Sequence, residues 1–376
     1  MKILRTIALA GASALALSLI ACSPPPTSTN TTGNVSDKAA SAAAVAQEAF
    51  DEISALSGAE REATLIEKAQ KEGTLALYTS NVSISDVTAA FKKKYGINVD
   101  TYLGTSESVL QRVSQEHQAD YFGADVVEGN GTALNLLNDE GLFAEYKSAA
   151  RDALPPVAQA DGWTASRFAV FATAWNTNLI KPADEPKSFE DLADPRFKGM
   201  LSMELSDGDW FYTMTQYFLD QGKSQAEIDD LFKKIMANSS MTSGHTQQAK
   251  LLAAGQFGVC VACYTDAIDR GAASGAPVTW HMSNGDPVQP LVNRTSGTAM
   301  LKTAQHPYAA ILFEDFMLGP EVQKLLTDDH RIGSVPTAND PLKGLLVLAI
   351  DDDAILKNSA KIQADYAALV KLAGGN

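Results

Sequence analysis

Residues 74–103 read TLALYTSNVSISDVTAAFKKKYGINVDTYL. The first six residues form a short apolar run that predicts a strand, and a polar turn follows them. Ser85 can cap a helix over residues 86–94, and Gly96 is placed to end that helix. Residues 97–103 then alternate in polarity like a second strand. The stretch therefore predicts a strand–helix–strand unit, which is the building block of an α/β sheet.

The same alternation continues along the chain. Further strands are predicted at 124–127, 168–175, 200–203, 257–263 and 298–301. Further helices are predicted at 65–72, 106–118, 132–139, 210–220, 225–238, 247–254, 306–318 and 321–328. Strands that alternate with helices predict a sheet covered by helices on both faces.

The folded part is too long for one hydrophobic core. About 315 residues follow residue 59, and chains longer than about 250–300 residues usually divide into more than one hydrophobic core. We expect two lobes. Lobe 1 is predicted from residues 60–165 and 296–340, and lobe 2 from residues 166–295 and 341–376.

The N-terminal residues have the pattern of an export signal. Lys2 and Arg5 precede an uncharged run over 6–21, which predicts a signal peptide at residues 1–21. That run breaks at Cys22-Ser-Pro-Pro-Pro before it reaches the length of a membrane span. Residues 19–22, Leu-Ile-Ala-Cys, resemble the lipobox of bacterial lipoproteins, which implies a lipid on Cys22 and an anchor in the membrane. A plain secretory peptide is the alternative.

Small and polar residues dominate the next segment. Residues 22–59 are rich in Pro, Thr, Ser, Asn and Ala and predict a flexible tether, partly helical around 38–56. The protein is therefore expected outside the cytoplasm, held to the outer face of a bacterial membrane.

Composition and motifs exclude several classes of function. The formal net charge of −15 argues against nucleic acid or anionic lipid as a partner. The sequence has no Gly-x-Ser-x-Gly, His-Glu-x-x-His or P-loop pattern, so we expect neither an enzyme nor a bound cofactor. Cys260 and Cys263 lie in an apolar run rather than at a helix start. They predict two buried thiols or a local disulfide, not a redox site.

A set of short blocks resembles a known family. The blocks are Leu77-Tyr-Thr-Ser80, residues 91–99, Ala124-Asp-Val-Val127, Glu140-Gly-Leu-Phe143, Trp175-Asn-Thr-Asn-Leu179, Phe189-Glu-Asp-Leu192, residues 194–199 and His306-Pro-Tyr-Ala-Ala310. Their order and spacing, over about residues 60–340, are similar to the extracellular solute-binding proteins of the ferric-iron-binding type.

That resemblance implies the fold and the role. Members have a type II periplasmic-binding fold, in which crossing strands join two α/β lobes that close on a ligand in the cleft. They deliver ferric iron, phosphonates or small organic solutes to an ABC permease. We expect this chain to be a monomer. A surface scaffold or an enzyme on the same fold is a more distant alternative.

Ligands of α/β lobes bind beyond the carboxyl ends of the strands, so the loops there are the candidate site. In lobe 1, hydroxyls and helix N-termini offer an anion site, and Glu128 offers a carboxylate to a cation or an amine. The candidates in lobe 1 are Thr79, Ser80, Asn81, Thr105, Ser106, Glu128 and Asn130. Helix capping alone also accounts for Thr105 and Ser106.

In lobe 2, the N-termini of two predicted helices, the side chains of two aromatic residues and one arginine are expected to line the cleft. The candidates are Asp207, Trp210, Ser243, His245, Tyr264, Asp266 and Arg294. Trp210 and Tyr264 can instead belong to the lobe core, and Arg294 can form a structural ion pair.

The ligand is predicted to be an organic or phosphorus-containing anion or zwitterion. Iron-binding relatives carry adjacent tyrosines at the segment around Tyr264, but here Thr265 and Asp266 follow it. Losing one of two phenolates removes much of the charge that a ferric ion needs. The alternative is an iron site built from Tyr264, Asp266, Glu128 and His245.

Overall fold

The structure is a computed structural model of the 376-residue chain, and it describes residues 36–337 and 340–373. The predicted signal peptide and Cys22 lie outside the described residues. Among the residues described, no helix is both long enough and apolar enough to cross a membrane.

Eleven strands are described, and they join in one sheet. They are β1 (Thr74–Thr79), β2 (Asn98–Leu103), β3 (Val126–Asn130), β4 (Thr164–Asn176), β5 (Leu201–Glu204), β6 (Ser239–Thr242), β7 (Val259–Tyr264), β8 (Val278–Thr279), β9 (Leu291–Met300), β10 (Ile332–Gly333) and β11 (Val347–Ala349).

The α-helices that surround these strands begin ahead of β1 and extend to residue 370. They are α1 (Asp37–Ser54), α2 (Gly58–Glu72), α3 (Ile84–Tyr95), α4 (Ser106–Gln118), α5 (Gly131–Asp139), α6 (Ala149–Asp152), α7 (Gly208–Asp220), α8 (Gln225–Ala237), α9 (His245–Ala253), α10 (Thr265–Ala273), α11 (Pro307–Met317), α12 (Pro320–Asp328) and α13 (Asp352–Val370). The predicted α/β alternation is confirmed.

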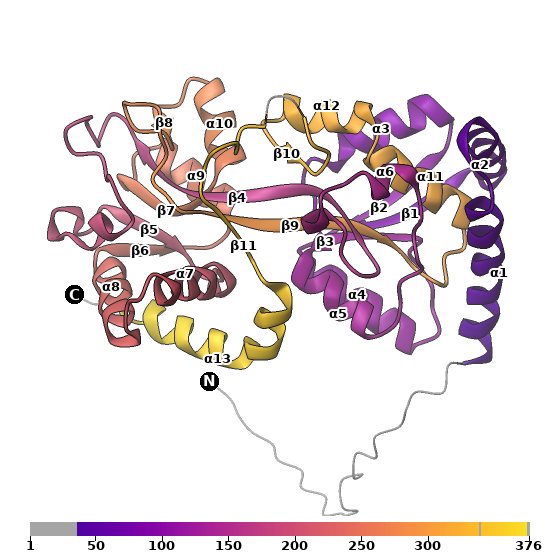
Figure 1. The fold of residues 1–376 in the computed structure, drawn as a ribbon, viewed down its shortest axis with the longest axis horizontal. Helices are drawn as coiled ribbons and strands as arrows, with labels where there is room; N and C mark the ends of the chain where they lie inside the picture. Colours follow the sequence, from indigo (N-terminus) through magenta and orange to yellow (C-terminus); the bar gives the residue numbers. More distant parts are fainter. Residues whose placement is uncertain (1–35, 338–339, 374–376) are drawn as a thin grey trace, which may run out of the picture. The chain divides into compact units, whose positions relative to one another are not determined.

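The two longest strands, β4 and β9, lie at the centre of the sheet and extend from one lobe to the other. The main strand order is β2-β1-β3-β9-β4-β7-β5-β6, with β4 and β9 antiparallel at its centre. The first half of β4 pairs with the end of β9, whereas its second half also pairs with β7. Figure 1 shows β4 and β9 running side by side between β1–β3 at one end and β5–β8 at the other.

Buried apolar residues form separate cores at the two ends of these strands. One core gathers residues from α1–α5, β1–β3 and α11, including Leu77, Phe91 and Phe313. A second core gathers residues from β4, β5, α7, α8 and α13, including Trp175 and Phe232. We call the part around the first core lobe 1 and the part around the second core lobe 2. A third cluster, which includes Phe257, covers the other face of the sheet in lobe 2.

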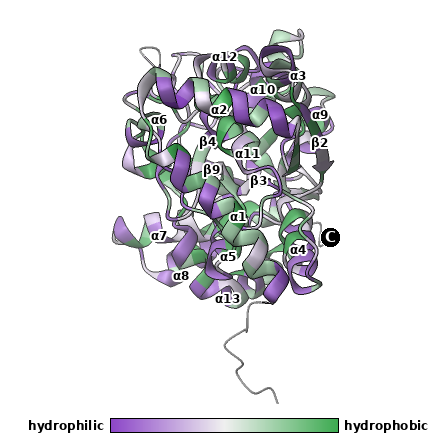
Figure 2. Cartoon of the chain, turned by 90° about the vertical axis from the view of Figure 1, so that its right-hand side faces the viewer, coloured by the Kyte–Doolittle hydropathy of each residue, from purple (hydrophilic) through white to green (hydrophobic). Residues whose placement is uncertain are grey.

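The segment predicted as a tether differs from that expectation within the described residues. Helix α1 buries Ala46, Phe50 and Ile53 in the core of lobe 1. Figure 2 looks onto α1, with α2 and α11 beside it. Residues 37–54 therefore form part of lobe 1, because one aromatic and one branched side chain on the same face provide enough apolar surface to dock the helix.

Cys260 and Cys263 form a disulfide inside β7, and both residues are fully buried. Of the two outcomes left open by the sequence, the structure has the local disulfide. The motif lies in a strand, as expected.

Candidate functional site

The polar residues after β1, β3 and before α4 form a hydrogen-bonded group in lobe 1. Thr79 Oγ1 donates to the Glu128 carboxylate, and its oxygen accepts from the Asn81 amide at 2.9 Å. Ser106 Oγ donates to Ser80 Oγ at 3.0 Å. These strand ends meet because β1 is parallel to β2 and pairs with β3 in register. The structure thus brings together the lobe 1 candidates that the sequence predicted, apart from Thr105.

Thr105 and Ser106 have different roles. Thr105 is the N-cap of α4, and its side chain accepts from the Ser108 amide at 3.2 Å. It is exposed, so capping accounts for it. Ser106 Oγ instead accepts from the Asn130 amide at 3.1 Å, so it links α4 to the end of β3. Asn130 in turn caps α5 by accepting from the Ala133 amide.

Arg167 was not among the predicted site residues, yet it lies at the centre of this group. It projects from β4 onto the buried Glu128 carboxylate and donates to it through Nη1. Arg167 is 9% exposed. The sequence does contain a signal for Arg167, because it is a charged residue directly before the apolar run FAVFATAW. The predicted strand began at residue 168, so Arg167 was not counted as part of the strand.

Arg331 is the second cation of this region that the sequence did not reveal. Its Nη1 donates to Asn81 Oδ1 at 2.8 Å, and its Nη2 donates to Ser83 Oγ at 3.0 Å. Nε lies 2.9 Å from Asp329 Oδ2, close enough for an ion pair. Burial, and then the nearby charge of Arg167, lower the pKa of Arg331. The positive charges of Arg167 and Arg331 therefore lie near enough to repel each other.

Asp266 lies where the two lobes meet rather than free in the cleft. Its carboxylate accepts from Arg270 Nη1 at 2.8 Å and lies 3.8 Å from Arg331 Nε. Arg270 also donates to the backbone oxygen of Asp329 at 3.0 Å. Lobe 2 and the end of α12 in lobe 1 are therefore linked through these charges.

A second group forms in lobe 2 around the buried carboxylate of Asp207. His245 Nε2 lies 3.0 Å from Asp207 Oδ1, a distance that suits an ion pair if the imidazole is protonated, although the angles do not meet those of a hydrogen bond. The rings of His245 and Tyr264 stack with centroids 4.2 Å apart, and Phe171 packs on both. Burial raises the pKa of Asp207 even though His245 and Arg294 favour its charge.

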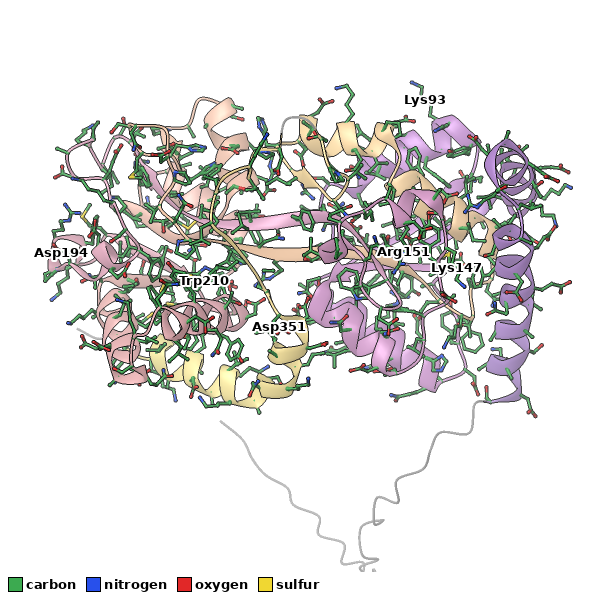
Figure 3. The ribbon with its side chains drawn as sticks, viewed as in Figure 1. Lys93, Lys147, Arg151, Asp194, Trp210 and Asp351 are labelled. Atoms are coloured by element: carbon green, nitrogen blue, oxygen red, sulfur yellow. A yellow bond between two sulfur atoms is a disulfide. The ribbon has the colours of Figure 1, made fainter. Side chains whose placement is uncertain are left out.

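Arg294 makes the structural ion pair that the sequence left open. Its Nε and Nη2 donate to the two oxygens of Asp209 at 2.9 and 2.6 Å, and Nη1 donates to Tyr264 Oη. All three guanidinium nitrogens are therefore used, and the Asp209 partner was missed. Trp210, labelled in Figure 3, belongs to the lobe core. It packs on Phe189 and Phe232, and Ser243 is exposed.

The four residues suggested for an iron site are not gathered. Glu128 is held by Arg167 and Thr79, and Asp266 is held by Arg270. Burial raises the pKa of Tyr264, which opposes the phenolate form that binds ferric ion. Among the described residues, Glu204, Asp207 and His245 do bring one ligand atom each within 4.8 Å of the others.

A groove of about 1120 Å³ lies between the lobes on the side of α13. Its walls come from α4 and α5 in lobe 1 and from the start of α7 in lobe 2, and Asn130, Asp209 and Arg294 line it. The groove therefore reaches the ends of both polar groups.

Comparison with known proteins agrees with this architecture. The sequence profile of the bacterial extracellular solute-binding proteins matches residues 124–358. The Fe(3+)-binding periplasmic protein of Serratia marcescens is 26% identical over 287 residues, which cover 72% of this chain and 82% of the relative.

Two solved structures illustrate the fold. Iron-bound HitA from Pseudomonas aeruginosa superposes with a TM-score of 0.65 at 22% identity, covering 78% of this chain and 99% of that one. AfuA from Actinobacillus pleuropneumoniae, with fructose-6-phosphate bound, has a TM-score of 0.67 at 22% identity, covering 80% and 100%. Both likenesses concern the fold, which is the type II periplasmic-binding fold.

The chain belongs to the bacterial extracellular solute-binding protein family. Proteins of this family bind small solutes outside the cytoplasm for ABC importers, and the predicted class is confirmed.

Proposed function

We propose that this protein captures an anionic organic or phosphorylated solute between Arg167, Arg331 and the α4 N-terminus, and hands it to an ABC permease. In keeping with the sequence, we propose that it is exported, lipidated at Cys22, monomeric and without enzymatic activity. AfuA, whose structure contains fructose-6-phosphate, supports a phosphorylated ligand by analogy of fold.

The uncommitted donors of Arg167 carry this proposal. Among the described residues its hydrogen bond goes to Glu128 through Nη1 alone. Nε and Nη2 make no hydrogen bond to a described residue, and the side chain is 11% exposed. A guanidinium offers these two N–H groups as a fork that matches two oxygens of a carboxylate or a phosphate.

Neighbouring groups suit the same anion. The positive charge of Arg331 is already disfavoured by burial and by Arg167, so a bound anion would relieve the repulsion between the two cations. The hydroxyls of Ser80 and Ser106 and the first amides of α4 lie at the same strand ends. Helix N-termini bind anions through their free amides and the helix dipole.

Thermal unfolding of the purified protein tests the proposal, because a ligand that binds the native state raises stability. The probes are inorganic phosphate, fructose 6-phosphate, citrate and ferric citrate. Arg167→Lys keeps a cation for Glu128 but loses the fork, and should weaken anion binding roughly tenfold. Lys324→Gln, an exposed cation of α12, should leave binding unchanged.

Two results would contradict an anion at Arg167. One is wild-type affinity in Arg167→Lys; the other is a panel in which no anion raises the unfolding temperature. Stabilisation by ferric ion alone would instead favour the second candidate function.

That second candidate is capture of a metal ion by lobe 2, and the group formed by Glu204, Asp207 and His245 favours it. Asp207 is 1% exposed and neither oxygen accepts a hydrogen bond of good geometry. Against it, Arg294 Nη2 lies 3.6 Å from Asp207, and Glu204 already accepts from Ser206 and Gly244. His245→Gln should abolish stabilisation by a metal and leave that by an anion intact.

A further inference from the structure

The C-terminal helix α13 is part of lobe 2. It buries Ile355, Ile362, Tyr366 and Leu369 in the lobe 2 core. The preceding strand β11 adds in parallel to the start of β9, and the Ile350 amide donates to the Asn293 oxygen at 3.0 Å. Both contacts fix the position at which α13 begins.

The first turn of α13 nevertheless contacts lobe 1. Thr132 Oγ1, in the first turn of α5, donates to Asp352 Oδ1 at 2.8 Å. A Cβ atom at Gly131 would lie 2.1 Å from Asp352 Oδ2, so the carboxylate rests directly on the backbone at the start of α5. Helix α5 buries Leu134 and Leu137 in the lobe 1 core. Figure 3 shows the start of α13, marked by Asp351, on the side of that helix nearest to α5.

We propose that α13 is a strap between the lobes: the Asp352 carboxylate docks on the N-terminus of α5, ties lobe 1 to lobe 2 on this side of the groove, and occupies that helix end in place of a solute anion.

The chemistry of the contact supports a tie. Asp352 accepts from the Thr132 hydroxyl, whereas the Ala133 amide of the same turn donates to Asn130 Oδ1. The carboxylate is therefore held by a side chain of the first turn, at the helix end where the dipole favours a negative charge. Burial raises the pKa of Asp352 to about 6, so the group is mostly ionised at neutral pH. The charges that face it are Asp209 of α7 and Arg294 of β9, in addition to Asp351 beside it, and Arg294 favours the ionised form.

The strap also contacts the start of α7. A Cβ at Gly208 would lie 3.1 Å from Ile362 Cγ2, so α13 packs closely against that helix end as well. Helices α5 and α7 both begin at the groove between the lobes. One helix therefore borders the first turns of both, through Asp352 in its own first turn and Ile362 near its middle.

Small-angle X-ray scattering of the purified protein, dialysed free of solute at pH 7.5, tests the proposal without knowledge of the ligand. Asp352→Ala removes the carboxylate, and Gly131→Ala places a methyl group where the carboxylate rests. Both should increase the radius of gyration, and amide exchange in the first turn of α5 should rise roughly tenfold. Asp353→Ala, an exposed acid one residue further along α13, is the matched control and should match the wild type.

The double variant Asp352→Ala/Gly131→Ala separates the contact from general loosening. If both substitutions act through one contact, the double variant should open no further than either single variant. Wild-type scattering in both single variants would overturn the proposal, as would an equal effect of Asp353→Ala. Additive opening in the double variant would show that the two residues act separately and would also overturn it.

Discussion

At the residue scale, the buried Glu314 of α11 gives a prediction for the pH dependence of stability. It is 1% exposed, accepts from Thr298 Oγ1 at 2.8 Å, and burial raises its pKa to about 8. Because the folded state holds this proton more tightly than the unfolded chain, the stability it contributes is complete below about pH 4.5 and is lost as pH rises to about 8. Glu314→Gln should flatten this part of the profile.

Chemical denaturation at pH 5 and pH 8 provides the measurement. The difference in free energy of unfolding between the two pH values should be smaller in Glu314→Gln than in the wild type. Glu145→Gln, an exposed carboxylate, should keep the wild-type difference. An unchanged difference in Glu314→Gln would mean that Glu314 is ionised in the folded protein.

Single residues also show how far the sequence predicts the site. Thr79, Ser106 and Glu128 lie together as expected, because each is at or just beyond the carboxyl end of a strand that the sequence predicted. Arg331 could not be found this way, since it follows α12, far along the chain, and reaches Asn81 only through the fold. Long-range ion pairs leave no local pattern, so their partners cannot be read from sequence.

At the scale of elements, the crossing of β4 and β9 depends on a glycine. A Cβ at Gly297 would lie 2.2 Å from the Thr164 oxygen and 2.7 Å from the Trp163 ring. Gly297→Ala should therefore push the two strands apart and lower the free energy of unfolding by about 1–3 kcal/mol. Gly129→Ala is the control, since its nearest neighbour would be 3.6 Å away. Equal stability of the two variants in denaturant would contradict the close crossing.

Helix α1 packs into the core of lobe 1, whereas the sequence predicted a flexible tether that is partly helical there. Its alanines predicted little core, yet Phe50 is 4% exposed and packs into lobe 1. Phe50→Ala should lower the free energy of unfolding by about 3 kcal/mol. Val45→Ala, on the exposed face of the same helix, should change it by less than about 0.5 kcal/mol. Similar small effects of both would restore the tether interpretation.

At the scale of the whole described part, the lobes are linked at two places besides the crossing strands. One is the proposed strap between α13 and α5. The other joins α10 to the end of α12 through Arg270, which reaches the Asp329 oxygen at 3.0 Å and its carboxylate at 3.4 Å. Figure 1 shows α10 and α12 on the opposite side of β4 and β9 from α13. The alternation of strands and helices predicted both lobes, but it contains no information on these links.

Arg270→Gln should loosen the α10–α12 side and increase the radius of gyration of the solute-free protein. Lys324→Gln removes an exposed α12 cation whose ion pair stays within that helix, and should have no effect. Because the two links share no residue, Arg270→Gln combined with Asp352→Ala should open the lobes by the sum of the single effects. If the combined variant has the radius of gyration of the wild type, β4 and β9 alone set the distance between the lobes. The charged contacts between the lobes would then form as a result of closure and would not stabilise it.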